Sequence, residues 1–201
     1  MRSASRVVLA LLFAPVTALG QIDPDSDGIG IYFDHDATLV STTAAPGNDG
    51  IVSVTAYLVA THLAVQGEVS QWSASVGTTP RGVIPDCWSW VCGGPTAGFN
   101  YAENTPGSNH WSFAVLVDPT EHLPIDSAVV LATVVVSATC AGPVCLYVDY
   151  AELASLSGST VTLNPSSGGW HLPVAIINGE APVRAATATW SMVKRLYERA
   201  R

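Results

Sequence analysis

The sequence predicts an all-β protein built as an antiparallel β-sandwich, and three observations support this fold class. Short segments in which apolar and polar residues alternate recur along the chain, as in strands with one buried face. Turn-forming stretches such as residues 46–50 and 106–109 separate these segments. Hydrophobic residues make up 48% of the 201 residues and charged residues only 12%, which favours a buried core over intrinsic disorder.

The alternating segments are expected to form the strands of the sandwich. Ile29, Ile31 and Phe33 alternate in the first segment, and Trp111 and Phe113 begin a later one. Side chains two residues apart in a strand face the same side, so each such series predicts a core-facing surface. The predicted strands are residues 29–34, 51–60, 69–76, 111–117, 128–139, 145–153, 159–163 and 173–177.

Residues 128–148 form a long, nearly uncharged stretch that approaches the length of a transmembrane helix. It is rich in valine, holds two cysteines and contains a central Gly-Pro turn. These features favour a buried β-hairpin over a membrane span. We expect this hairpin to be closed by a disulfide between Cys140 and Cys145.

The chain divides into four predicted parts. Residues 1–20 have a positive start, a short apolar run and small residues before Gln21, which is typical of a secretory signal peptide. Residues 21–178 form the sandwich, and residues 179–188 form a linker. Residues 189–201 form a basic amphipathic helix. A signal peptide predicts a secreted, extracytoplasmic protein.

Charge is distributed unevenly between these parts. Between residues 21 and 180 the chain has fifteen acidic residues and one basic residue, Arg81. Five basic residues and one acidic residue follow from position 181 onward, so the tail is basic. A nucleic-acid-binding role is not expected, because phosphate contacts require clustered Lys and Arg on the folded domain.

Four cysteines lie in the mature sequence: Cys87, Cys92, Cys140 and Cys145. An even number of cysteines in an exported chain indicates disulfide bonds. The two C-x4-C spacings predict local pairs, Cys87 with Cys92 and Cys140 with Cys145. A zinc site is the alternative for such spacing.

The acidic segment at the mature N-terminus is a candidate calcium loop. Carboxylates at loop positions 1, 3 and 5, followed by glycine at 6, resemble the first half of an EF-hand loop. Calcium would be bound by the side chains of Asp23, Asp25, Asp27 and Asp34 and by the carbonyl of Ile29. Position 12 of the loop is Asp34 instead of the usual Glu. The alternative to a calcium site is a solvated acidic turn.

Trp88 and Trp90 lie in a predicted loop between Cys87 and Cys92 and face the same way. Exposed indoles at this spacing would stack on sugar rings or anchor a protein partner. The alternative is that both fill the core, as is expected of Trp72, Trp111 and Trp170.

The C-terminal segment places Trp190, Val193 and Tyr197 on one face of a helix. Lys194 and Arg195 lie beside this face, so the helix would either dock on the sandwich or bind a partner.

Four stretches carry a resemblance to a known group: DPDSDGIGIYFD, TAYLVATHL, LPIDSAVVLATVVVSAT and TWSMVKRLYER. Together they resemble exported bacterial β-sandwich proteins of unknown function. The LATVVV strand and the strand that follows it are also similar to cohesins and related carbohydrate-binding sandwiches. The resemblance implies a cohesin-like or immunoglobulin-like sandwich that acts as an interaction module.

These observations predict a secreted, non-catalytic module that binds a protein or a polysaccharide at the cell surface. One alternative is a carbohydrate-binding module that uses Trp88 and Trp90. Another is a small secreted hydrolase with a carboxylate pair that the linear spacing does not reveal. Calcium is the only cofactor that the sequence suggests.

Overall fold

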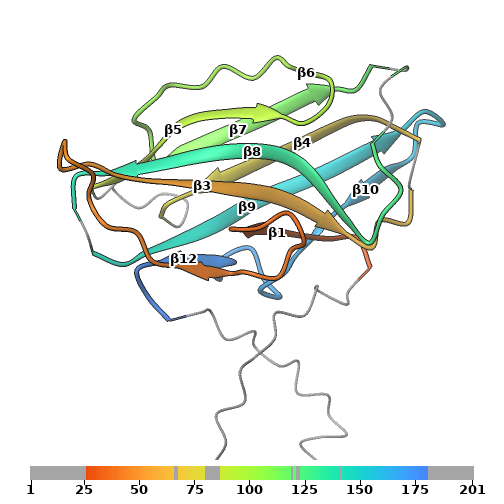
Figure 1. The fold of residues 1–201 in the computed structure, drawn as a ribbon. Helices are drawn as coiled ribbons and strands as arrows, with labels where there is room; N and C mark the ends of the chain where they lie inside the picture. Colours follow the sequence, from red (N-terminus) through yellow and green to blue (C-terminus); the bar gives the residue numbers. More distant parts are fainter. Residues whose placement is uncertain are drawn as a thin grey trace, which may run out of the picture.

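The computed structural model describes residues 26–65, 68–79, 87–118, 120, 123–140 and 142–180. This part of the chain is all-β and forms two packed sheets, which Figure 1 shows as two layers. It contains no helix that is long and apolar enough to cross a membrane. The predicted signal peptide, the predicted helix 189–201 and the residues Trp190, Lys194, Arg195 and Tyr197 lie outside the described residues.

The first sheet, here called sheet I, has five strands in the order β11-β1-β3-β8-β5. Its strands are antiparallel except for the parallel pair β1 and β11. The central strands β3 and β8 pair from Val52 and Ala138 to Thr61 and Ala128, with one register shift between Leu58 and Val59. The strands of sheet I are β1 (Gly28–Tyr32), β3 (Val52–Thr61), β5 (Trp88–Pro95), β8 (Ala128–Ala138) and β11 (Asn164–Pro165).

The second sheet, sheet II, has the order β2-β12-β9-β4-β7-β6, with β10 also paired to β9. Its central strands β9, β4 and β7 are antiparallel, and only β2 and β12 pair in parallel. Its strands are β2 (Ser41–Thr42), β4 (Val69–Gly77), β6 (Phe99–Asn100), β7 (His110–Leu116), β9 (Val144–Ser155), β10 (Thr160–Thr162) and β12 (Ala175–Ile177).

The core lies between the two sheets and follows the alternation expected from the sequence. In β7 the residues Trp111, Phe113 and Val115 are buried, whereas the residues between them are more exposed. Trp72 on β4 packs against Phe113, with ring centroids 5.3 Å apart. The predicted sandwich and the core positions of Trp72 and Trp111 are therefore confirmed, and Trp170 packs partly buried against the same core.

The predicted hairpin over residues 128–148 is wrong. Strand β8 pairs with β3 and β5 in sheet I, whereas β9 pairs with β4, β10 and β12 in sheet II. The chain therefore crosses from one layer to the other between Ala138 and Val144. A sandwich allows this because both strands can present alternate apolar residues to the same core from opposite sides.

The disulfide pairing also differs from the predicted local pairs. Cys87 is bonded to Cys140, while Cys92 and Cys145 are free. The reason lies in strand β5, which extends the chain after Cys87 and carries Cys92 away from it. Pairing of Trp88 with Ala138 brings Cys87 beside Cys140 instead, with their Cα atoms 6.0 Å apart.

Replacement of Cys87 by Ser should destabilise the protein, because the disulfide restricts the unfolded chain. For a sequence separation of 53 residues, the chain-entropy relation predicts a loss of about 4 kcal/mol in unfolding free energy. Chemical denaturation measures this loss, and Cys92→Ser at an exposed, unbonded position is the matched control. Recovery of a Cys87–Cys92 peptide by mass spectrometry without reduction would contradict the observed pairing.

Candidate functional site

Trp88 and Trp90 do not form an exposed platform. They lie in strand β5 instead of a loop, and their side chains are only 1% and 0% exposed. They do face the same way, but toward the core, where Trp88 Nε1 donates a hydrogen bond to the carbonyl of Gly142 at 3.2 Å. Buried indoles offer no ring face to a sugar, so the predicted use of these two residues in ligand binding is wrong.

The described part of the predicted twelve-residue calcium loop, residues 26–34, contains a strand instead of a continuous loop. Residues Gly28–Tyr32 are strand β1, and an extended strand rises about 3.3 Å per residue. Asp27 and Asp34 therefore lie at opposite ends of a strand and cannot bind one ion. The Ile29 carbonyl accepts a hydrogen bond from Ser166 N in the neighbouring strand region.

The acidic side chains at both ends of β1 have structural partners. Asp27 Oδ1 accepts a hydrogen bond from Ala64 N at 2.8 Å. Asp34 Oδ1 accepts hydrogen bonds from the backbone N–H groups of Thr38 and Leu39, and the Thr38 hydroxyl donates to Oδ2. Within the described ranges no cluster of His, Cys, Asp and Glu is arranged for a metal ion. Asp23 and Asp25 lie outside those ranges.

Both cavities described below open on the solvent-facing side of sheet II, here called the outer face. In the central strands, inward residues alternate with outward ones, and the register aligns the outward residues in rows. Phe99 and Gln71 both lie opposite Leu116, and Gln71 lies opposite Ala154. The outer face comprises Gln71, Ser73, Ser75, Phe99, Tyr101, His110, Ser112, Ala114, Leu116, Asp149, Tyr150, Glu152 and Ala154.

One end of the outer face is apolar and unusually exposed. The side chains of Phe99, Tyr101 and Leu116 are 69%, 56% and 51% exposed. The turn that presents them requires Gly98, which has a φ of 84° and whose added Cβ would lie 2.3 Å from the Leu116 carbonyl oxygen. The close approach of Gly98 to β7 therefore holds Phe99 opposite Leu116, which β7 itself presents.

The edge of β7 beside this apolar end is closed by amide side chains. Asn100 Oδ1 accepts a hydrogen bond from Ala114 N, and the side chain of Asn104 bonds both the N–H and the carbonyl of Ser112. Tyr101 N donates to the Ala114 carbonyl. These bonds occupy backbone groups that an added strand would need, so the outer face is the available surface here.

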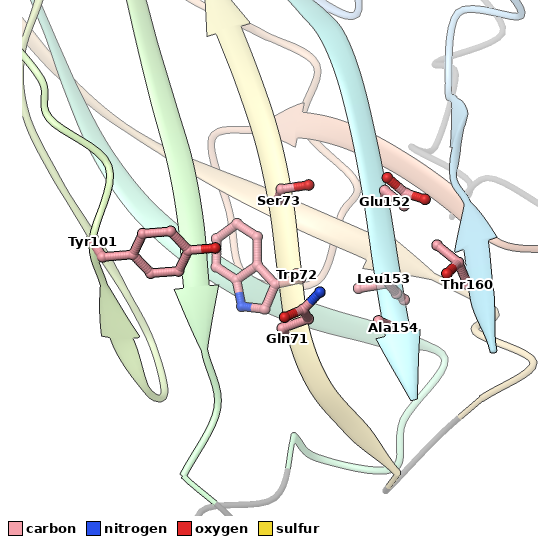
Figure 2. A pocket seen from close by; sticks show the side chains of 8 residues that line it. All are labelled: Gln71, Trp72, Ser73, Tyr101, Glu152, Leu153, Ala154 and Thr160. Carbon is pink, nitrogen blue, oxygen red and sulfur yellow. The ribbon is translucent and has the colours of Figure 1, made fainter. Parts of the chain in front are cut away.

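A shallow cavity of about 140 Å³ lies between the apolar end and strand β9. Figure 2 shows Gln71 and Ser73 on β4 between Tyr101 on one side and Glu152 and Thr160 on the other. The cavity combines the aromatic residues Tyr101 and Trp72 with amide, hydroxyl and carboxylate groups. Such a mixture suits the side chains of a protein partner.

A second cavity of about 260 Å³ lies further along the same face and is lined by Ser75, His110, Ser112, Asp149 and Tyr150. His110 Nδ1 and Asp149 Oδ2 are 2.8 Å apart. The imidazole–carboxylate pair has the form found in serine hydrolases. Among the described residues, no hydroxyl hydrogen-bonds to Nε2 of His110.

A β-bulge places this pair, and the sequence carries a signal for it. Val144, Leu146 and Val148 are buried in the first half of β9, whereas Ala151 and Leu153 are buried in the second half. This change of parity coincides with the register shift next to Ser75 and Val76. Asp149 and Tyr150 together fall between two inward residues, so both belong to the outer face.

The comparisons with known proteins bear on the fold. No family model matches the sequence, and no curated protein matches it. The sixth cohesin of scaffoldin B from Acetivibrio cellulolyticus, solved in complex with a dockerin mutant, is similar in structure. It has a TM-score of 0.50 and 12% identity, with 78% of this chain and 100% of that chain covered.

Two further cohesins have lower scores. A cohesin module of a family 33 glycoside hydrolase from Clostridium perfringens has a TM-score of 0.48 and 11% identity, over 76% of this chain and 97% of its own. A type II cohesin from the Acetivibrio cellulolyticus cellulosome has a TM-score of 0.47 and 14% identity, over 79% of this chain and 98% of its own. The predicted cohesin-like sandwich is confirmed by the first structure.

The hydrogen bonds of Asp34 predict a pH-dependent contribution to stability. Partial burial raises the pKa of this carboxyl, but the hydrogen bonds from Thr38 and Leu39 outweigh burial and hold the pKa below its usual 3.8. A depressed folded-state pKa gives a stabilisation that is present above the ordinary value and is lost as the pH falls through the folded value. Asp34→Asn should therefore lower Tm at pH 7 and reduce the fall in Tm between pH 7 and about pH 3.

Thermal unfolding at both pH values measures this effect, and Asp36→Asn is the matched control on the same turn. A rise in Tm on addition of calcium that disappears in Asp34→Asn would contradict the purely structural role and restore Asp34 as a ligand.

Proposed function

We propose that this protein is a non-catalytic interaction module that binds a protein partner across the outer face of sheet II. The observation that carries the proposal is the exposed apolar group Phe99, Tyr101 and Leu116, held in place at one end of a polar face. Exposed apolar side chains rimmed by polar residues are characteristic of protein-binding surfaces. Aromatic residues at such positions supply much of the binding energy.

The cohesin-like fold supports a protein as the partner. The Acetivibrio cohesin with this fold is in complex with a dockerin mutant, which is itself a protein module. We propose a partner of the same general kind, a small folded module that binds the outer face of sheet II through one of its surfaces. The described residues include no lysine or arginine but many carboxylates, so electrostatic complementarity favours a basic partner surface.

Export from the cytoplasm belongs to the same proposal. The predicted signal peptide supports it, and so does the Cys87–Cys140 disulfide, because disulfides persist in oxidising compartments. A cell-surface polysaccharide is the second candidate ligand, favoured by the exposed rings of Tyr101 and Tyr150 on the outer face. Calcium binding by Asp23 and Asp25 stays a prediction.

Replacing Tyr101 and Leu116 together by Ser should strongly weaken partner binding and leave folding intact, because both side chains are solvent-exposed. Loss of one hot-spot side chain costs about 2 kcal/mol or more, so the dissociation constant should rise at least about 30-fold. The partner is first crosslinked from the exported protein fraction, then purified and titrated against both forms by calorimetry.

Ile125→Ser is the matched control, because Ile125 is exposed but lies outside the outer face. Equal partner affinity of the double variant and the unmodified protein would refute the proposed surface. If purified glycans bind the unmodified protein but not the double variant, the ligand of the outer face is a polysaccharide and not a protein.

A further inference from the structure

We infer that the cavity between β4, β7 and β9 is a binding site for a single ammonium or guanidinium group. Its lining residues are Ser75, His110, Ser112, Asp149 and Tyr150, and its volume is about 260 Å³. Small-molecule pockets usually enclose roughly 300–1,000 Å³. This cavity is somewhat smaller than such pockets and has room for the end of a long basic side chain, Lys or Arg.

Asp149 is the anionic group of the site. Its side chain is only 7% exposed, because the bulge in β9 sets it between neighbouring strands. A buried carboxylate is costly unless it is paired and hydrogen-bonded. Its Oδ2 atom contacts His110 Nδ1 at 2.8 Å and accepts a long hydrogen bond from Ser75 Oγ at 3.5 Å. Oδ1 receives no hydrogen bond from any described residue.

His110 makes the cavity richer in acceptors. A neutral imidazole that donates Nδ1–H to the Asp149 carboxylate presents Nε2 as an acceptor. The hydroxyl groups of Ser75, Ser112 and Tyr150 also accept hydrogen bonds. No lysine or arginine lies in the described part of the chain, so none is available there to pair with the Asp149 carboxylate. The cavity therefore offers hydrogen-bond acceptors but contains no lysine or arginine to donate to them.

An ammonium or guanidinium group supplies what is missing. Lysine brings three donors and arginine five, and neither has an acceptor. Either group can donate to Asp149 Oδ1 and to a neighbouring acceptor at the same time, and charge-assisted bonds of this kind are the strong ones. The inference rests on the proposed function only for the source of the cation, which is a basic side chain of the partner or of this chain's own tail.

The binding of a free cation to the mature full-length protein tests the site without any partner. The probe is methylguanidinium chloride, followed by shifts of backbone amide resonances in NMR spectra. Saturable shifts are expected at Ser75, Ser112 and Tyr150. Urea, which is neutral and of similar shape, and sodium chloride at equal ionic strength should not produce them. Absence of a saturable shift at these residues would overturn the inference.

Variants on the same strand show whether Asp149 is responsible. Asp149→Asn keeps the side-chain shape and removes the charge, so the saturable shifts should be lost. Glu152→Gln removes an exposed carboxylate outside this cavity and should leave them unchanged. Ser112→Leu fills the cavity from β7 and should also abolish the saturable shifts. It replaces Asp149→Asn as the test if that variant does not fold. Shifts that survive in both Asp149→Asn and Ser112→Leu would also overturn the inference.

The source of the cation is found by carbodiimide crosslinking of the full chain. Lys194 is the only lysine, so a lysine–carboxylate crosslink within the protein has one possible amine partner other than the N-terminus. A Lys194–Asp149 crosslink supports the site and assigns the cation to the chain's own tail. Saturable methylguanidinium binding without that crosslink supports the site and assigns the cation to a partner. The proposed function is tested separately, by the affinity of the partner for the Tyr101 and Leu116 double variant.

Discussion

The alternation of inward and outward side chains along β4, β7 and β9 is the constraint on which both the core and the outer face depend. Trp72, Phe113 and Leu153 are fully buried from these three strands. Burying each such side chain contributes roughly 1.5–3 kcal/mol. A shift of the register by one residue would turn all of them to solvent, so the register is strongly fixed. The outer face is consequently positioned by residues that never touch a ligand.

The sequence was informative where structure depends on this local period. It predicted the sandwich, most of its strands and the core positions of Trp72 and Trp111. The same period also runs through Trp88 and Trp90, which strand β5 buries, but their position between two cysteines suggested a loop. The bulge in β9 that places Asp149 was not predicted, although the change of parity between Val148 and Ala151 is a signal for it in the sequence.

Features that depend on which strands become neighbours could not be predicted in this way. The Cys87–Cys140 bond follows from the pairing of β5 with β8, and linear spacing favours nearer cysteines. The acidic pattern from Asp23 to Asp34 matched a calcium loop in spacing, but the apolar residues within it form strand β1. In both cases a local motif was overruled by strand formation, which buries apolar side chains and satisfies backbone groups together.

The hydrogen-bond partners of the carboxylates distinguish structural positions from the proposed functional one in this acidic fold. Because the described residues hold no lysine or arginine, those of their carboxylates that are shielded from water depend on other hydrogen-bond donors. Asp27 uses a backbone N–H and Asp34 uses two backbone N–H groups and a hydroxyl, all from neighbouring loops. Asp149 is more buried than a turn residue, yet both of its contacts converge on one oxygen. Asp27 and Asp34 are thus satisfied by neighbouring loops, whereas Asp149 lines a cavity and its Oδ1 receives no hydrogen bond from any described residue. A donor from outside the sandwich can bind there.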